Sequence, residues 1–378
     1  MAEQQSVAGA PARAVLEGVP RVGFYRGERC PEDYPYPSCL RAILEYLGDD
    51  YGCRHTPGRD PAWRLGCPYA HFMGVTGAAF FLSWKPGWHP DNVAIHYMSD
   101  DPGAPFRRGL DAVGYRYEMV SWHGGEQDEA SVRSMVVESI HGRGRPALAF
   151  GVIGPPEPSI IAGYDDHGEV LIGWSFFQDD PESAGGAERE PCGYFRKRDW
   201  FNATEGLVLI GDKAEPRKLD DVYRDSLRWA LTVMRTPVTH GDRRNGHAAY
   251  TAWADHLQRD KDFATDDIGV LRGRHGVHDD AVGFVAEGRW YGALFLAHAA
   301  QQMGGPGVSR ELLAASACLA AEHDLMWQVW DLGGGNGRDD DKVRKLAEPE
   351  VRRQIVPIIL EARGKDVEAA AHIERTLS

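Results

Sequence analysis

The chain has 378 residues, which is enough for two domains that each bury a hydrophobic core. Asp and Glu outnumber Lys and Arg by 56 to 42, and the net charge of −14 repels phosphate backbones, so nucleic acid is not an expected partner. No stretch approaches the roughly eighteen consecutive apolar residues of a transmembrane helix, so we expect a soluble protein with no membrane partner.

The N-terminus and the cysteines both favour a cytoplasmic protein. Residues 1–19 lack a positively charged start followed by an apolar run, so they predict a flexible tail and not a signal peptide. The cysteines include no C-x-x-C pair, which fits reduced thiols better than a disulfide framework. Four of them fall close together, at Cys30, Cys39, Cys53 and Cys67. Their irregular gaps lack the paired spacing of a zinc site, so we expect no metal and no other cofactor.

The first strong element is an amphipathic helix within YPSCLRAILEYLG, residues 36–48. Pro37 and Ser38 are typical of a helix start, and Gly48 is typical of a helix end. Apolar residues recur at three- and four-residue intervals and give the helix one side that faces a core, made by Leu40, Ile43, Leu44 and Leu47.

Cys39 is predicted in the first turn of this helix. Unpaired backbone N–H groups and the positive end of the helix dipole stabilise a thiolate there and lower its pKa. The residue also precedes the apolar side, so its side chain need not point into the core. These features favour a nucleophile, and the alternative is a small buried hydrophobic residue.

The segment that follows offers material for a binding pocket. HFMGVTGAAF, residues 71–80, contains Gly74, Thr76 and Gly77, where a backbone could approach a ligand closely. Trp88 lies in a predicted loop, PGWHPDN, and could line an apolar cleft.

Antiparallel strands are predicted further along the first half. β-forming runs occupy residues 147–153, 160–162 and 170–174, and the turn sequence DDHG joins the last two. A helix followed at a distance by a small antiparallel sheet predicts an α+β domain over residues 20–212. Trp174 would line the same cleft as Trp88, with Tyr164 and Asp165 as polar anchors.

From residue 213 to residue 378 the pattern becomes helical. Apolar residues recur at three- and four-residue intervals in five long segments, and the breaks between them fall at residues 236–246, 263–278 and 304–308. This pattern predicts an all-α second domain of five or six helices.

These segments together resemble the papain-like superfamily. The likeness rests on a Cys at the start of an amphipathic helix, followed about 120 residues later by GYDD, a turn and VLIGW. The chain is most similar to bacterial peptidase-like domains related to the leader-cleaving peptidases, and to the N-terminal domain of the butirosin-biosynthesis H-type acyltransferases. The segments AYTAWADHL and EGRWYGALFLAHAA also resemble the helical region attached to that acyltransferase-type domain.

The resemblance implies a papain-like domain, in which a nucleophile helix packs on a small antiparallel sheet, and Cys39 would be the nucleophile. The His of the family lies about six residues before the Gly of GYDD, where this chain has Glu157. An oxyanion donor usually precedes the Cys by about six residues, where this chain has Asp33. The residue that orients the His would fall near Gly173 or Trp174.

The replacement of His by Glu matters energetically. Moving a proton from an ordinary thiol to an ordinary His costs about 2.7 kcal/mol, whereas moving it to an ordinary Glu costs about 5.7 kcal/mol. A helix start returns only about 0.3 to 2 kcal/mol of this. Glu157 is therefore a poor general base unless burial raises its pKa by about two units or more.

Three readings remain open. In the first, Cys39 and Glu157 work together, and a desolvated Glu157 shuttles protons or holds the ammonium group of an attacking amine. In the second, another histidine replaces the missing one, and His71, His89 and His96 are the candidates. In the third, the domain keeps the fold, lacks the chemistry and binds a small molecule or a peptide.

The preferred interpretation is a bacterial, cytoplasmic, thiol-dependent enzyme that acts on an amide, peptide or thioester acyl group, by acyl or aminoacyl transfer or by hydrolysis. Its expected partner is a small-molecule or peptide substrate, such as a carrier-bound acyl group or a cationic amine, because an acidic anchor in an aromatic cleft suits a cation. The alternative is a catalytically inactive binding module, whose helical half can serve as the surface of a homodimer.

Overall fold

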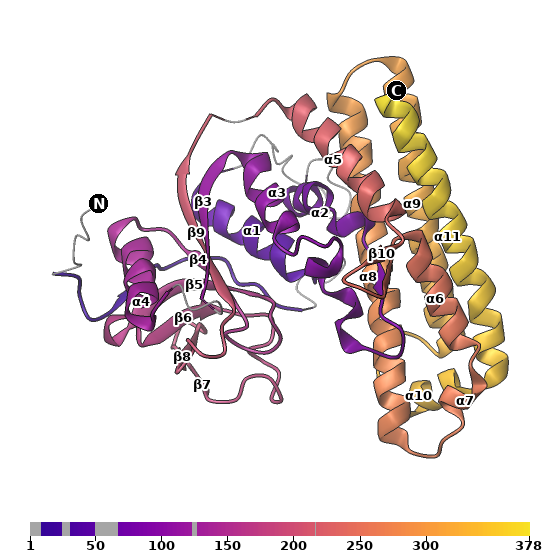
Figure 1. The fold of residues 1–378 in the computed structure, drawn as a ribbon, viewed down its shortest axis with the longest axis horizontal. Helices are drawn as coiled ribbons and strands as arrows, with labels where there is room; N and C mark the ends of the chain where they lie inside the picture. Colours follow the sequence, from indigo (N-terminus) through magenta and orange to yellow (C-terminus); the bar gives the residue numbers. More distant parts are fainter. Residues whose placement is uncertain (1–8, 25–30, 50–66, 123–126, 216) are drawn as a thin grey trace. The chain divides into compact units, whose positions relative to one another are not determined.

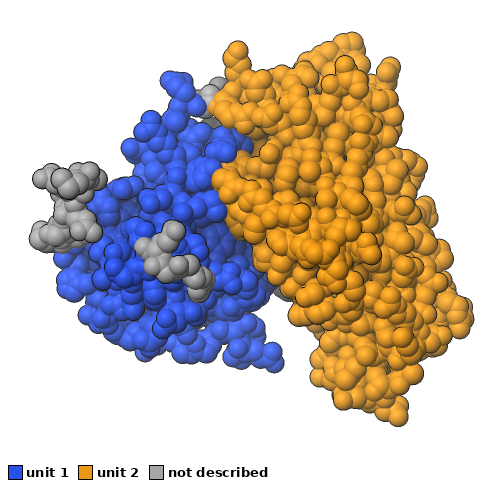
Figure 2. Space-filling model, viewed as in Figure 1, with its two compact units in different colours: residues 1–52, 110–216 blue, residues 53–109, 217–378 orange. Residues whose placement is uncertain are grey.

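The computed structural model describes residues 9–24, 31–49, 67–122, 127–215 and 217–378. The chain forms two compact units, and both are discontinuous in sequence (Figure 2). Unit 1 consists of residues 1–52 and 110–216, and unit 2 consists of residues 53–109 and 217–378. Unit 1 mixes helices with an antiparallel sheet and unit 2 is mainly helical, so the predicted α+β class is confirmed.

The sheet of unit 1 is antiparallel throughout (Figure 1). Its central strand β5 ends within the predicted GYDD segment, at Asp165, and pairs with β4 on one side and β6 on the other. The strand order along the sheet is β3 (Tyr115–Ser121), β9 (Gly206–Lys213), β4 (Ala147–Phe150), β5 (Pro158–Asp165), β6 (Val170–Trp174), β8 (Phe195–Arg198) and β7 (Ala187–Arg189).

Helices cover both faces of this sheet. Helix α4 (Glu129–Val137) and the π-helical turn that follows it (Glu138–Gly142) cover one face, where their apolar residues share a core with Ile161 and Leu209. Alternate residues of the same strands, such as Ile160 and Val208, are also buried and face the other side. Helix α1 (Pro35–Tyr46) packs there against β5.

The N-terminal segment is attached to the sheet, although residues 1–19 were predicted as a flexible tail. Strand β1 (Ala14–Val15) pairs with β5, and the hydroxyl of Tyr164 donates to the carbonyl of Pro11 at 3.1 Å. Arg13 adds an ion pair with Glu190 at 3.0 Å. The pairing partner of β1 lies far along the chain, so the local composition of residues 9–19 gave no sign of it.

Unit 2 is built around three long helices, α8 (Ile268–Gln302), α9 (Pro306–Gly333) and α11 (Pro349–Leu377), which pack along one another (Figure 1). The described part of the unit also contains α2 (Pro68–Thr76), α5 (Leu219–Arg235), α6 (His247–Leu257), α7 (Asp260–Phe263), α10 (Asp340–Ala347) and three short 3-10 turns, η2 (Ala78–Phe80), η3 (Pro90–Val93) and η4 (Ile95–Tyr97). None of the described helices is long and apolar enough to span a membrane.

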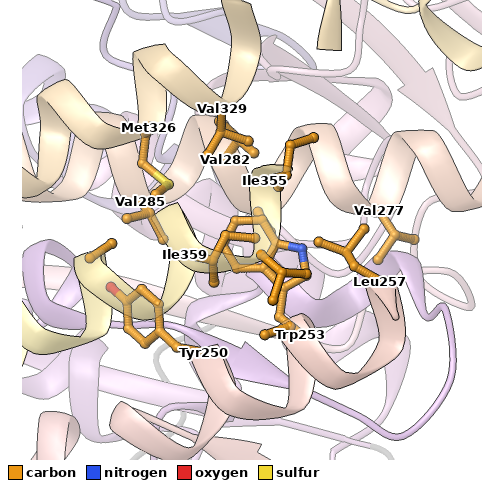
Figure 3. Close-up of a cluster of buried hydrophobic side chains, with 14 of the residues drawn as sticks. Tyr250, Trp253, Leu257, Val277, Val282, Val285, Met326, Val329, Ile355 and Ile359 are labelled. Carbon is orange, nitrogen blue, oxygen red and sulfur yellow. The ribbon is translucent and has the colours of Figure 1, made fainter. Parts of the chain in front are cut away.

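The core of unit 2 is formed by apolar side chains that meet from α6, α8, α9 and α11 (Figure 3). Trp253 and Leu257 of α6 lie beside Val282, Met326 and Ile359, and all five are almost fully buried. Helix α8 begins at Ile268, inside the break predicted at residues 263–278. Its start is fixed because the carboxylate of Asp267 accepts a hydrogen bond from Gly269 N at 2.8 Å.

Residues 67–109 belong with the helices of unit 2, whereas the sequence placed them in an α+β domain of residues 20–212. Strand β2 (Ser83–Trp84) pairs with β11 (Arg243–Asn245), which also pairs with β10 (Val238–Thr239). Trp84 stacks on Trp253 with ring centroids 6.0 Å apart. These partners lie some 160 residues along the chain. The predicted boundary after residue 212 lies close to the observed one after residue 216.

Candidate functional site

Helix α1 places Cys39 in its second turn, one turn further in than predicted. The helix begins at Pro35, and Ser38 N donates to the carbonyl of Tyr34 at 3.2 Å, so Ser38 is inside the helix and does not cap it. Pro35 and Pro37 also occupy the first turn, and a proline carries no N–H group. The backbone donors that would stabilise a thiolate at Cys39 are therefore absent from those positions.

The Cys39 thiol is buried and neutral. Its side chain has no solvent exposure, and its Sγ donates a weak hydrogen bond to the carbonyl of Pro158 at 3.6 Å. Burial raises the pKa of the thiol, and the nearby charge of Glu157 raises it further, while the charge of Arg41 opposes both. The prediction of a lowered pKa at position 39 is wrong, because burial outweighs the helix dipole.

Glu157 lies immediately before β5 and beside Cys39. It ends a tight loop in which Gly151 N donates to the carbonyl of Glu157 at 3.2 Å, and Gly151 and Gly154 take positive φ angles of 82° and 79°. The residue keeps partial solvent exposure, yet burial of its carboxyl group raises the pKa to about 8. At pH 7 most molecules therefore carry a protonated Glu157.

The structure thus brings together the two residues that the sequence paired across more than one hundred positions. The sulfur of Cys39 contacts the residue directly after Glu157, and the two side chains interact electrostatically. The increase in the Glu157 pKa exceeds the two units that the energetic argument required. The pair carries at most one negative charge, because an anion on either residue raises the pKa of the other.

The three histidines proposed as replacement bases belong to unit 2, whereas Cys39 belongs to unit 1. His71 lies on α2 and is only 3% exposed, and burial lowers its pKa to about 4. Burial likewise lowers the pKa of His96 to about 4. His89 is partly exposed and directly precedes η3.

Unit 1 offers no replacement base beside the thiol within its described residues. No hydrogen bond joins Cys39 to a histidine in this part of the chain. Its described histidines, His141 and His167, are both exposed, and His167 lies beyond the far end of β5 from Cys39. Among the described residues of unit 1, Glu157 is therefore the carboxyl group that interacts with Cys39, and the buried Tyr36 also interacts with the thiol electrostatically.

The glycine-rich segment packs tightly inside unit 2 instead of lining a pocket. A Cβ on Gly74 would lie 2.2 Å from the ring of Phe295. Gly77 ends α2 in the left-handed conformation, with a φ of 91°, and Thr76 donates from its hydroxyl to the carbonyl of Phe72 at 2.7 Å. All these residues are buried, so their small size serves helix packing.

Tyr164 and Asp165 also have structural partners. They lie at the far end of β5, about 20 Å from Pro158 along the strand. The hydroxyl of Tyr164 is used by Pro11, and Asp165 accepts from Arg196 at 2.9 Å, which lowers the pKa of that carboxyl. Residues seven positions apart look close in the sequence, but in an extended strand they lie far apart in space. The sequence therefore could not show that Tyr164 and Asp165 lie far from Pro158.

The two tryptophans of the predicted cleft are held separately. Trp174 Nε1 donates to the carbonyl of Val19 at 2.9 Å, and its ring packs edge-on against Tyr194, within unit 1. Trp88 belongs to unit 2, where its Nε1 donates to Asp262 at 3.2 Å. The two tryptophans that the sequence assigned to one cleft therefore each contact other parts of their own unit.

Sequence reasoning missed Arg41, whose charge acts on Cys39. Arg41 Nε lies 2.6 Å from the carboxylate of Glu32, and its Nη1 lies 2.8 Å from Glu45. The positive charge of Arg41 favours a thiolate at Cys39. The four-residue spacing of Arg41 and Glu45 was a visible signal for this pair. Asp33 is partly exposed and precedes α1 by two residues.

No group of three metal-ligating side chains occurs among the residues that the structure describes. Cys30 and Cys53, which the sequence placed near Cys39, lie outside those residues. Cys67 directly precedes α2 and belongs to unit 2.

Comparison of the chain with models of known protein families finds no match. Comparison with curated proteins also finds no significant similarity.

Proposed function

We propose that this protein is a thiol-dependent enzyme of papain-like fold that acts on an amide, peptide or thioester acyl group, with Cys39 as nucleophile and Glu157 as proton carrier. The observation that supports it most is the contact of Cys39 Sγ with the residue next to Glu157, whose buried carboxyl has a pKa of about 8. A carboxyl group tuned to that range is suited to general acid and base catalysis near neutral pH. The packing of α1 on β5 is compatible with a papain-like arrangement.

The reaction begins with an ionised Glu157. Its carboxylate takes the thiol proton while the sulfur forms a bond to the acyl carbon, and the resulting tetrahedral intermediate expels the leaving group as Glu157 returns the proton to it. The acyl group then remains on Cys39 as a thioester. An amine or a water molecule attacks this thioester, Glu157 takes the proton of the attacking group, and the departing sulfur recovers it as a thiol.

Charge coupling makes Glu157 a better partner than its ordinary chemistry suggests. Part of the increase in the thiol pKa comes from the negative charge of Glu157. This contribution disappears once the carboxylate accepts the proton, because the newly formed thiolate then faces a neutral acid. The remaining cost comes mainly from burial, and the nearby charge of Arg41 reduces it.

Full burial of Cys39 sets a condition on this mechanism. A sulfur without solvent exposure cannot reach an acyl carbon, so the region around α1 and the loop before β5 must open for the substrate to bind. The nucleophile is then protected from solvent between reaction cycles.

A second candidate function follows from the same burial. A raised thiol pKa is the opposite of what an activated nucleophile shows, and this observation favours a non-catalytic domain in which Cys39 is a packing residue. Such a domain would bind a small molecule or a peptide without turning it over.

Acyl-enzyme trapping distinguishes the two candidates. The full-length protein is incubated with simple acyl thioesters, and peptide mass spectrometry locates any acyl group that it retains. The enzyme predicts acylation of Cys39 that is lost in Cys39→Ala and slowed in Glu157→Gln, while Cys318→Ala, which removes a partly buried cysteine of unit 2, serves as the control. Absence of acylation at Cys39 from pH 7 to pH 9, in a folded protein, would rule the enzyme out.

A further inference from the structure

Unit 2 contains a cluster of charged side chains that are fully excluded from solvent. Arg289 on α8, Glu322 on α9 and Asp366 on α11 all have zero exposure. Arg289 Nε lies 3.2 Å from Glu322 Oε1 and 3.0 Å from Asp366 Oδ1. Its Nη2 donates to the hydroxyl of Tyr250 on α6 at 2.8 Å, and its Nη1 donates to the carbonyl of Ala79 at 2.8 Å. The guanidinium of Arg289 therefore links its own helix α8 to three other helices, α6, α9 and α11, and to the segment after α2.

The charges of this cluster do not balance if both acids are ionised. Two carboxylates around one guanidinium leave a net charge of −1 in a core without solvent, which is strongly unfavourable. The second oxygens, Glu322 Oε2 and Asp366 Oδ2, are also buried, and neither receives a hydrogen bond from the described residues. Tyr250 already donates its hydroxyl proton to Glu322 Oε1. Counted over the described residues, the cluster therefore lacks one proton donor and one positive charge.

His247 is the neighbouring group that could supply both. It is the first residue of α6, and its Nε2 lies 3.4 Å from Asp366 Oδ2. Burial lowers the pKa of His247, and the positive charges of Arg289, Arg363 and Arg235 lower it further, while Asp366 alone among the named groups raises it. A neutral His247 can still offer one ring N–H, but its lowered pKa means that it does not supply the positive charge, so the excess negative charge of the cluster must be neutralised by another proton.

We infer that Glu322 is protonated in the folded protein and shares its proton with Asp366, so that α9 and α11 are joined by an acid and a carboxylate and not by two anions. The proton comes from solvent during folding. With it in place, Arg289 is balanced by the single charge of Asp366, and the two orphan oxygens become a donor and an acceptor for each other. The cluster is then neutral.

The groups around Glu322 favour its protonated form. Burial is the largest cause that raises its pKa well above the ordinary range, and the negative charge of Asp366 raises it further. Arg289 and Tyr250 act in the opposite direction and are outweighed. Cys318, one turn earlier on α9, is the remaining titratable group that interacts with Glu322 among those described.

A buried proton makes the stability of the protein depend on pH. Glu322 is ionised in the unfolded chain at neutral pH and protonated in the folded chain, so folding takes up one proton. The unfolding equilibrium constant should therefore rise about tenfold per pH unit from this group alone, between the ordinary Glu pKa and the raised value in the folded protein. Alkaline conditions would remove the proton and favour separation of α9 from α11.

Urea unfolding of the full-length protein from pH 6 to pH 9 tests this inference. In Glu322→Gln a neutral amide replaces the neutral acid, so the ratio of the wild-type unfolding constant to that of the variant should grow about tenfold per pH unit. Glu361→Gln on the exposed side of α11 is the matched control and should follow the wild type. Parallel curves for the wild type and Glu322→Gln would overturn the inference, and so would a loss of the pH dependence in His247→Gln.

Infrared spectroscopy gives a reading that does not depend on the folding of Glu322→Gln. A protonated carboxyl group has a carbonyl stretch separate from that of a carboxylate. Glu157 is also protonated at pH 7, so the spectra are recorded in the Glu157→Gln background, where the remaining buried-acid band should come from Glu322. In Asp366→Asn on this background the band should disappear, because Glu322 can then ionise beside Arg289. A Glu157→Gln spectrum without the band, or a band unchanged by Asp366→Asn, would contradict the shared proton.

Discussion

Replacement of Glu157 by Gln should change two activities of Cys39 in opposite directions. Gln keeps the size of the side chain and removes the negative charge that raises the pKa of the Cys39 thiol. Taking about 6 Å, the outer limit at which two charged groups directly shift one another's pKa, that repulsion is worth about 0.7 kcal/mol in water and about 2.8 kcal/mol at an effective dielectric constant of about 20. The partial exposure of Glu157 places the value toward the lower end.

The thiol pKa should therefore fall by about 0.5 to 1 unit in Glu157→Gln, and alkylation of Cys39 by iodoacetamide at pH 9 should become about three to ten times faster. The charge acts only above pH 8, where Glu157 is ionised in the wild type, so the two proteins should react alike at pH 6.5. Acyl transfer should instead slow by about a hundredfold or more, because the proton carrier is gone.

The measurement is the rate of carboxyamidomethylation of the Cys39 peptide by mass spectrometry, with Cys39→Ala to assign the signal. Glu205→Gln, on an exposed side chain of unit 1, is the matched control and should change neither rate. An alkylation rate that is unchanged or slower at pH 9 in Glu157→Gln would refute the electrostatic coupling. Equal acyl transfer in both proteins would refute the role of proton carrier.

Other changes test the site and its surroundings. The value of kcat/KM should rise with pH toward a plateau above about pH 8, because Glu157 must be ionised to accept a proton, and a rate independent of pH from 6 to 9 would exclude it as the base. Tyr164→Phe should lower the free energy of unfolding by about 1 kcal/mol through the lost hydrogen bond to Pro11, as measured by urea unfolding, and should leave acyl transfer unchanged. Gly74→Ala should destabilise the protein by about 1 to 2 kcal/mol because its methyl group would overlap Phe295, whereas Gly364→Ala, which has open space on α11, should stabilise it slightly; thermal unfolding of the two variants compares them directly.

The sequence predicted the candidate pair but not its environment. The distance of Glu157 from GYDD and the amphipathic pattern around Cys39 were enough to select both residues. They could not show the burial of the thiol, because Pro37 and Ser38 set the predicted helix start and placed Cys39 in the first turn, whereas the helix begins at Pro35. The solvent exposure of Cys39 depends on residues from distant parts of the chain that pack against helix α1, such as those of β5. A single sequence does not show which residues these are.

The fold was predictable where the contacts are local. The helices after residue 213 and the antiparallel strands of GYDD and VLIGW follow from periodicity and turn residues, and the structure contains them. The membership of residues 67–109 was not predictable, since β2 pairs with β11 from a distant part of the chain. The predicted pocket residues divide between the two units for the same reason: Gly74 and Trp88 are in unit 2, whereas Tyr164 is in unit 1.

The interleaved order of the two units determines how the protein can be made and divided. During synthesis the ribosome releases residues 67–109 long before α6, α8 and β11, so Trp84 must wait for its stacking partner until well over half of the chain has emerged. A fragment that begins at residue 213 would lack β2 and expose the surface on which Trp84 stacks. Expression of the helical part alone therefore requires the earlier segment to be supplied as well, for example by a fusion that joins the two pieces of unit 2.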